Sequence, residues 1–144
     1  MASVLLLTSV QEQLDYVGVP VRADGWYGYP DGLHTVAIYV QNFVGRVYIE
    51  GSLSIQPTDC DWFAIRLIHD AEYIQYPINP NNPSSVFVGG ASAVYGDTSV
   101  LGFTFKANIL WIRARVHRTY VFEPTLSPDR IGMLGNVTKI VLSL

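Results

Sequence analysis

Apolar and polar residues alternate along several stretches of this chain, and this alternation limits the fold more than any other feature. In the stretch 35–43, TVAIYVQNF, the apolar set Val36, Ile38 and Val40 would face one way. Alternation with period two is typical of strands that have one buried and one exposed face. Apolar residues seldom recur at helical spacing, and Pro or Gly interrupts nearly every long segment. The sequence therefore predicts an all-β fold.

Other stretches repeat this pattern, beginning with a first strand in SVLLLTSV near the N-terminus. In 46–55, the predicted inward residues are Val47, Ile49, Leu53 and Ile55, and the outward ones are Tyr48, Glu50, Ser52 and Ser54. In 103–118, the inward residues are Phe103, Phe105, Leu110, Ile112, Ala114 and Val116, and the outward ones are Thr104, Lys106, Trp111, Arg113, Arg115 and His117. In 136–144, Ile140, Leu142 and Leu144 point inward. We expect these last two stretches to be central strands.

Turn signals separate the strands. The link 42–46, NFVGR, contains Asn42 and Gly45, so we expect 35–43 and 46–55 to form a hairpin. The one helical signal, Ser127 followed by Pro128, allows about one turn. Eight or nine short strands in 144 residues favour a single domain, 1–144, built as a two-sheet antiparallel sandwich of jelly-roll type.

Two segments fit no strand and are predicted to be extended loops or arms. The first, 23–32, combines three aromatic residues with three glycines, and the second, 76–85, carries three prolines that would hold it extended. Such segments suit either an ordinary surface loop or an arm that a neighbouring subunit grips with little loss of entropy. Residues 1–24 are expected to provide an extended N-terminal strand or arm.

Composition points to a partner surface. Charged residues make up 15% of the chain, against about 25% in typical soluble domains. Seven arginines accompany two lysines, and arginine and tyrosine are enriched in buried interfaces whereas lysine is depleted there. The net charge of -3 argues against nucleic acid as the partner, and no apolar run is long enough to cross a bilayer. The single cysteine fits folding in a reducing cytoplasm.

Templates for catalysis fail one after another. The chain has no glycine-rich phosphate loop, no histidine pair at metal spacing and no Gly-x-Ser-x-Gly elbow. The acid pairs Asp24/Asp31 and Asp59/Asp61 are too sparse to hold calcium, and the second pair suits a turn. We therefore expect no enzyme activity and no catalytic, cofactor-binding or metal-ligating residue.

Two aromatic stretches are candidates for contact with a partner. In 61–70, DWFAIRLIHD, a strand would place Phe63, Ile65 and Leu67 on the core side and Trp62, Ala64, Arg66 and Ile68 on a contact side. In 23–32, the aromatic rings either plug the open end of the sandwich or meet another subunit, or they form a platform for a sugar, with Asp24 or Asp31 accepting hydroxyl hydrogen bonds. The predicted interaction residues are Trp26, Tyr27, Tyr29, Trp62, Arg66, Tyr76, Trp111, Arg113 and Arg115.

Four motifs in order, GYPDGLHTVAIYVQNFVGRVYIEGSL, PTDCDWFAI, GFTFKANILWIRARV and GNVTKIVLSL, give the chain a familiar appearance. Over residues 25–144 it resembles small virion structural proteins of tailed bacteriophages, especially phages of cyanobacteria and other marine myovirus-like phages. The resemblance implies a non-enzymatic β-sandwich subunit that decorates or cements the capsid, or an accessory protein of the neck, tail or baseplate.

The same resemblance implies partners and a place. The partners would be other copies of the chain in a symmetric oligomer and other virion proteins, such as the major capsid, neck or tail protein. The chain would be made in the bacterial cytoplasm and reside in the virion. The alternative is a receptor-binding module that holds host glycans on Trp26, Tyr27 and Tyr29.

Overall fold

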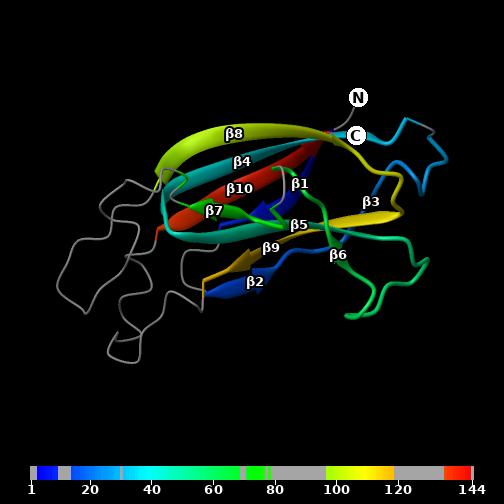
Figure 1. Ribbon diagram of the computed structural model, residues 1–144, viewed down its shortest axis with the longest axis horizontal. Helices are drawn as coiled ribbons and strands as arrows, with labels where there is room; N and C mark the ends of the chain where they lie inside the picture. The colour runs from blue at the N-terminus through cyan, green and yellow to red at the C-terminus, as the bar shows by residue number, and fades with distance from the viewer. Residues whose placement is uncertain are drawn as a thin grey trace.

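The computed structural model describes residues 3–9, 14–29, 31–68, 71–76, 78, 97–118 and 135–143. In these ranges the chain forms β-strands and no helix, and the strands build two antiparallel sheets that pack together (Figure 1). The strands are β1 Ser3–Thr8, β2 Asp15–Val17, β3 Val21–Arg22, β4 Leu33–Phe43, β5 Gly45–Ser52, β6 Phe63–Ala64, β7 Ile74–Tyr76, β8 Asp97–Lys106, β9 Trp111–His117 and β10 Asn136–Ser143. The predicted all-β sandwich is confirmed.

The strand order is that of a jelly roll. One sheet has the order β1-β10-β4-β8, and the other has the order β2-β9-β5-β6, with β3 also paired to β9 and β7 to β5. The pairs are nested along the chain: β1 with β10, β2 and β3 with β9, β4 with β8, and β5 with β6 and β7. A long double strand folded across two sheets gives this arrangement. The two ends of the chain consequently lie together, with Ser3 opposite Ser143.

The core lies between the sheets and consists of the inward residues of the alternating strands. On β4 these are the predicted Val36, Ile38 and Val40, each at most 4% exposed. On β9 and β10 the fully buried residues are the predicted Ile112, Ala114, Val116, Ile140 and Leu142, together with Val137. Because one side of each strand is apolar, two such sheets bury that side by packing on each other.

The predicted hairpin between 35–43 and 46–55 is wrong. β4 pairs with β8 and β10, whereas β5 pairs with β6, β7 and β9 in the other sheet. The chain changes sheet at Val44, between Asn42 with φ 49° and Gly45 with φ 153°. Phe43 and Val44 are buried and fill the end of the core, which the tip of a hairpin could not do. Turn residues mark the bend correctly but do not say whether the two strands stay in one sheet.

The stretches around 53–68 also differ from expectation. β5 ends at Ser52, so Leu53 and Ile55 are 63% and 68% exposed and do not enter the core. In 61–70, β6 has two residues and Phe63 is 44% exposed, so Phe63 does not belong to the core side predicted for this segment. Ile65 lies in the core and Leu67 packs against it, as predicted. Asp61 begins this segment in a turn, as expected, and the amide and hydroxyl of Thr58 donate to its carboxylate and lower its pKa.

The stretch 103–118 is two strands in different sheets, not one central strand. β8 lies at the edge of its sheet, whereas β9 and β10 are central. The N-terminal segment contributes β1 to one sheet and β2 and β3 to the other. Most of the 76–85 arm, the turn at Ser127 and the residues His69 and Leu144 lie outside the described residues.

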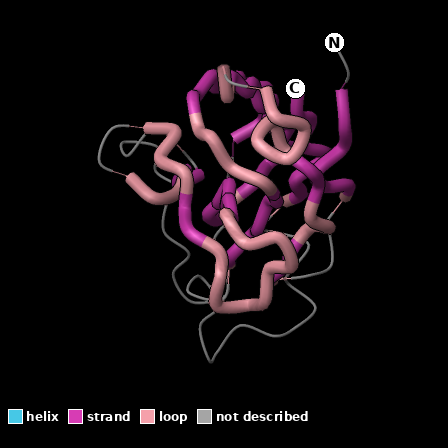
Figure 2. Tube along the Cα trace, turned by 90° about the vertical axis from the view of Figure 1, so that its right-hand side faces the viewer, coloured by secondary structure: helices cyan, strands magenta, loops and turns pink. Residues whose placement is uncertain are grey.

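Loops from three parts of the chain meet at one end of the sandwich, which faces the viewer in Figure 2. The β8–β9 connection lies between the others: Gly25 N donates to Ile109 O at 2.9 Å, and Leu110 N donates to Ser52 O at 3.0 Å. The indole Nε1 of Trp111 donates to Ile55 O at 3.1 Å. These bonds fix the aromatic 23–32 loop beside the start of β9.

Candidate interaction surface

The outer side of the β2-β9-β5-β6 sheet carries four of the seven arginines of a chain whose net charge is -3. The register places the outward residues of β5 directly opposite those of β9: Ser52, Glu50, Tyr48 and Arg46 face Trp111, Arg113, Arg115 and His117. On the other side of β9, Arg22 faces Trp111. We name this surface the arginine–aromatic face; it comprises Arg22, Trp26, Arg46, Tyr48, Glu50, Trp62, Tyr73, Trp111, Arg113 and Arg115.

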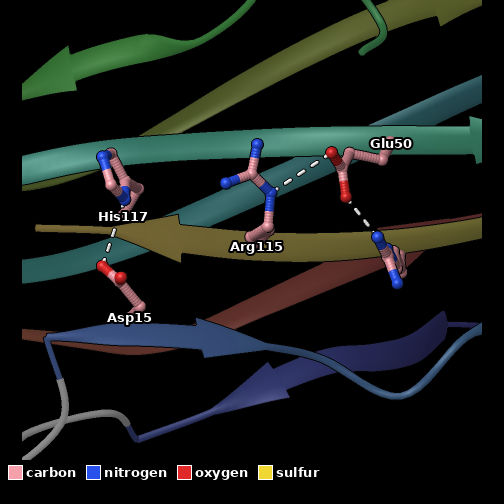
Figure 3. A network of polar contacts seen from close by, with 5 residues as sticks. Asp15, Glu50, Arg115 and His117 are labelled. Atoms are coloured by element: carbon pink, nitrogen blue, oxygen red, sulfur yellow. Dashed lines mark hydrogen bonds and ion pairs between the residues drawn. The ribbon is translucent and has the colours of Figure 1, made fainter. Parts of the chain in front are cut away.

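Glu50 lies between Arg113 and Arg115 on this face and contacts both; Figure 3 shows Glu50 beside Arg115. Arg113 Nε donates to Glu50 Oε1 at 2.9 Å, and Arg115 Nε donates to Glu50 Oε2 at 3.2 Å. The exposed fractions of the side chains are 9% for Glu50, 13% for Arg113 and 30% for Arg115. One carboxylate between two guanidinium groups leaves one net positive charge. The cluster can therefore attract an anionic group without being a broad basic patch.

Each of the four arginines lies over an aromatic ring. Guanidinium-to-ring distances run from 3.9 to 4.5 Å for the pairs Arg115–Tyr48, Arg113–Trp62, Arg46–Tyr73 and Arg22–Trp26. Arg46 Nε also donates to Gln75 Oε1 at 3.0 Å. Stacking of this kind is favourable and holds each long side chain in one orientation. A partner that binds here consequently costs the side chains less entropy than it would on mobile arginines.

The 23–32 loop divides its aromatic rings between two surroundings. Trp26 is partly buried and packs against Trp111 with ring centroids 5.3 Å apart and planes tilted by 56°. Tyr27 and Tyr29 stack on each other at 5.8 Å and are 50% and 56% exposed. The loop therefore adds Trp26 to the arginine–aromatic face and presents the two tyrosines separately.

Besides Tyr27 and Tyr29, two further predicted interaction residues lie off the arginine–aromatic face. Arg66 makes a long ion pair with Glu72 at 4.0 Å, and both side chains are 63% exposed. Tyr76 is fully buried in the core, edge-on to Phe43 with centroids 5.4 Å apart. Burial raises the pKa of Tyr76 well above its ordinary value, and Asp97 adds to this effect. Its side chain consequently does not belong to a binding surface.

Five of the interaction residues predicted from the sequence lie together on the arginine–aromatic face: Trp26, Trp62, Trp111, Arg113 and Arg115. The sequence prediction missed Arg22, Arg46 and Tyr73 as members, and it expected Tyr48 and Glu50 to point outward without giving them a role. The alternation along RVYIE already indicated that Arg46, Tyr48 and Glu50 share one side of a strand. That indication becomes specific only when β5 is known to lie beside β9.

The two histidines that the structure describes most fully, His34 and His117, contact groups of the protein itself. His34 is fully buried: its Nδ1 lies 2.9 Å from Gly32 O, its Nε2 accepts from Asp24 N at 3.3 Å, and its ring stacks on Phe105. His117 Nδ1 lies 3.1 Å from Asp15 Oδ1 at the end of the face (Figure 3). Among the residues that the structure describes, no three His, Cys, Asp or Glu side chains gather as a metal site would require.

No helix in the described part of the chain is long and apolar enough to span a membrane. No model of a known protein family matches the chain, and no curated protein or solved structure is significantly similar to it.

Proposed function

We propose that the chain is a non-enzymatic structural subunit of a bacteriophage particle, which decorates the capsid or serves as an accessory protein of the neck or tail. The observation that carries the proposal is the arginine–aromatic face, a pre-ordered surface without a catalytic arrangement among its residues. The resemblance of four sequence motifs to virion proteins is the reason for proposing a bacteriophage particle as the place where the chain acts, and it supplies what the fold does not. A jelly roll alone would not indicate this place, because capsid proteins, lectins and enzymes share it.

The chemistry of the face suits a protein partner. Tryptophan, tyrosine and arginine are the residues that contribute most to binding in protein interfaces. On this face they alternate as stacked pairs, so an incoming surface meets flat, ordered rings and guanidinium groups. The net positive charge of the Glu50 cluster favours an acidic patch on the neighbouring virion protein. A subunit of this kind stabilises a particle because it binds the assembled neighbours better than the free ones.

Particles of the phage that encodes the chain provide the test. We expect peptide mass spectrometry of purified particles to contain the chain, and antibody labelling in the electron microscope to place it on their surface. Absence of the chain from purified particles would refute the proposal.

Particles from a phage lacking the gene then test the face itself. They should bind added wild-type protein, and the double variant Arg22→Ala, Arg46→Ala should bind at least about tenfold more weakly, since interface arginines often contribute 1–2 kcal/mol or more. These substitutions leave the Glu50 cluster intact. Lys139→Ala is the matched control, because Lys139 forms a similar pair over Tyr39, at 4.5 Å, on the opposite sheet. Equal binding by the double variant and the control would show that another surface is used.

A second candidate function, recognition of host glycans, is favoured by the stacked and half-exposed pair Tyr27–Tyr29. Exposed aromatic rings can pack against the apolar side of a sugar ring. The double variant Tyr27→Ala, Tyr29→Ala should then abolish binding to an array of bacterial surface polysaccharides while particle binding persists. Absence of wild-type binding to the array would remove this candidate.

A further inference from the structure

The edge strand β8 is exceptional among the described strands. One side of β8 pairs with β4 along nearly its whole length, and the other side forms the border of the sheet, uppermost in Figure 1. The border of a sheet presents backbone N–H and C=O groups to any strand that can pair with them. Proteins usually block such edges with proline, central charges, irregular register or short strands.

None of these blocks is present in β8 between Ser99 and Lys106, because its register shift with β4 lies before Ser99. Its ten residues contain no proline, and its charged residues stand at the two ends, Asp97 and Lys106. The carboxylate of Asp97 already accepts a hydrogen bond within the chain, from Ile78 N to its Oδ2 at 2.7 Å. The pairing with β4 is regular from Ser99 to Lys106. The other edge strands are short, or, like β1, interrupted by a register shift.

The inward side chains of β8 leave apolar surface at this border. Leu101, Phe103 and Phe105 pack against the core but are each only partly buried, whereas the equivalent residues of the central strands are fully buried. A further strand beside β8 would cover them. Completion of the sheet and burial of apolar surface therefore favour the same event.

We propose that a second copy of this chain pairs with β8, antiparallel, about a twofold axis through Gly102. In this register residues whose numbers sum to 204 face each other, so inward residues meet inward residues and Leu101 lies opposite Phe103 of the second copy. The register pairs every residue from Thr98 to Lys106. A shift that centres the axis on Leu101 would instead set Asp97 against Phe105. The two four-stranded sheets become one continuous sheet, and the isologous contact closes at a dimer.

A substitution at Gly102 can disrupt this dimer without disturbing the monomer. It is exposed on the outer side of the sheet, and a Cβ built there meets only Val36 O, at an ordinary 3.9 Å, so the monomer has room for a side chain. On the twofold axis each Gly102 faces its own copy. Gly102→Lys would place two like charges directly opposite each other, which destabilises a strand pair.

The test is the mass of the purified chain in a sedimentation concentration series. The wild type should reach twice 16.0 kDa and no more, whereas Gly102→Lys and Gly102→Glu should each stay at 16.0 kDa. An equimolar mixture of the two variants should restore the dimer, because opposite charges then face each other. Leu5→Lys is the matched control: Leu5 is 54% exposed and lies in the same cross-strand row, through Val141 and Ala37, at the other border of the sheet.

Each other outcome overturns the proposal. A wild type that stays monomeric, a mass that keeps rising beyond two copies, or a dimer broken by Leu5→Lys and not by Gly102→Lys would exclude β8 pairing. Backbone amides of β8 should also exchange hydrogen more slowly in the dimer than in Gly102→Lys. The inference is independent of the proposed function, since Gly102 lies on the sheet opposite to the arginine–aromatic face.

Discussion

Removal of the charge on Glu50 should destabilise the protein far more than removal of a typical surface carboxylate. Glu50→Gln keeps the size of the side chain, but its one amide oxygen can accept from only one of the two arginines, Arg113 and Arg115, and its NH2 group faces the other. Both arginines then remain largely covered, without a counter-charge. From 1.5–3 kcal/mol for each charge-assisted bond, reduced because Arg115 is partly exposed, we expect a loss of about 3 kcal/mol.

Thermal and urea unfolding measure this loss. For a domain of this size, about 3 kcal/mol corresponds to a fall in Tm of roughly 6–12 °C. Glu72→Gln is the control, since Glu72 pairs with Arg66 at 4.0 Å and both side chains are 63% exposed; its cost should stay within about 0.5 kcal/mol. If the two variants unfold alike, Glu50 does not organise this face and the reasoning fails.

Replacement of the whole cluster separates its effect on stability from its effect on binding. The triple variant Glu50→Leu, Arg113→Met, Arg115→Met removes all three charges together, so no partner is left unpaired. Apolar replacement of complete buried ion clusters is often neutral or stabilising, so we expect stability within about 2 kcal/mol of wild type. Binding to particles should nevertheless be lost, because the arginines would no longer be there to meet the partner.

Two further predictions concern buried polar groups. The hydroxyl of Tyr76 is buried without a hydrogen-bond partner in the described part of the chain, so Tyr76→Phe should leave stability at pH 7 unchanged or raise it by about 1 kcal/mol. Because the folded-state pKa of Tyr76 is raised, the unfolded chain loses the Tyr76 proton first, and the stability of the wild type should fall as pH rises above about 10. Urea unfolding at pH 8 and at pH 10.5 should therefore show a smaller fall in stability for Tyr76→Phe than for the wild type. Equal falls would show that Tyr76 is not the group that titrates. His34→Phe should cost about 1–3 kcal/mol in urea unfolding, because Asp24 N–H loses its buried acceptor and Gly32 O keeps only its bond from Ala107 N. The 23–32 loop should then be cut sooner in limited proteolysis, whereas cutting at the wild-type rate would mean that His34 does not anchor it.

Period-two alternation was sufficient to predict the sandwich and the inward residues of its central strands. Val36, Ile38 and Val116 occupy the core because any strand with these side chains must bury one side, whatever its neighbours are. The same rule placed Arg113 and Arg115 outside. It failed for Leu53 and Phe63, because a pattern of side chains does not reveal where the backbone stops pairing.

The sequence by itself determined which side chains share one side of a strand, since that depends on the alternating backbone alone. Only the tertiary structure decided which strands lie side by side. It separated β4 from β5 at Val44, set Glu50 opposite Arg113, and left β8 at a border. These contacts join residues tens of positions apart, and they arise from the burial of two whole sheets against each other. No local stretch of sequence contains the information that selects them.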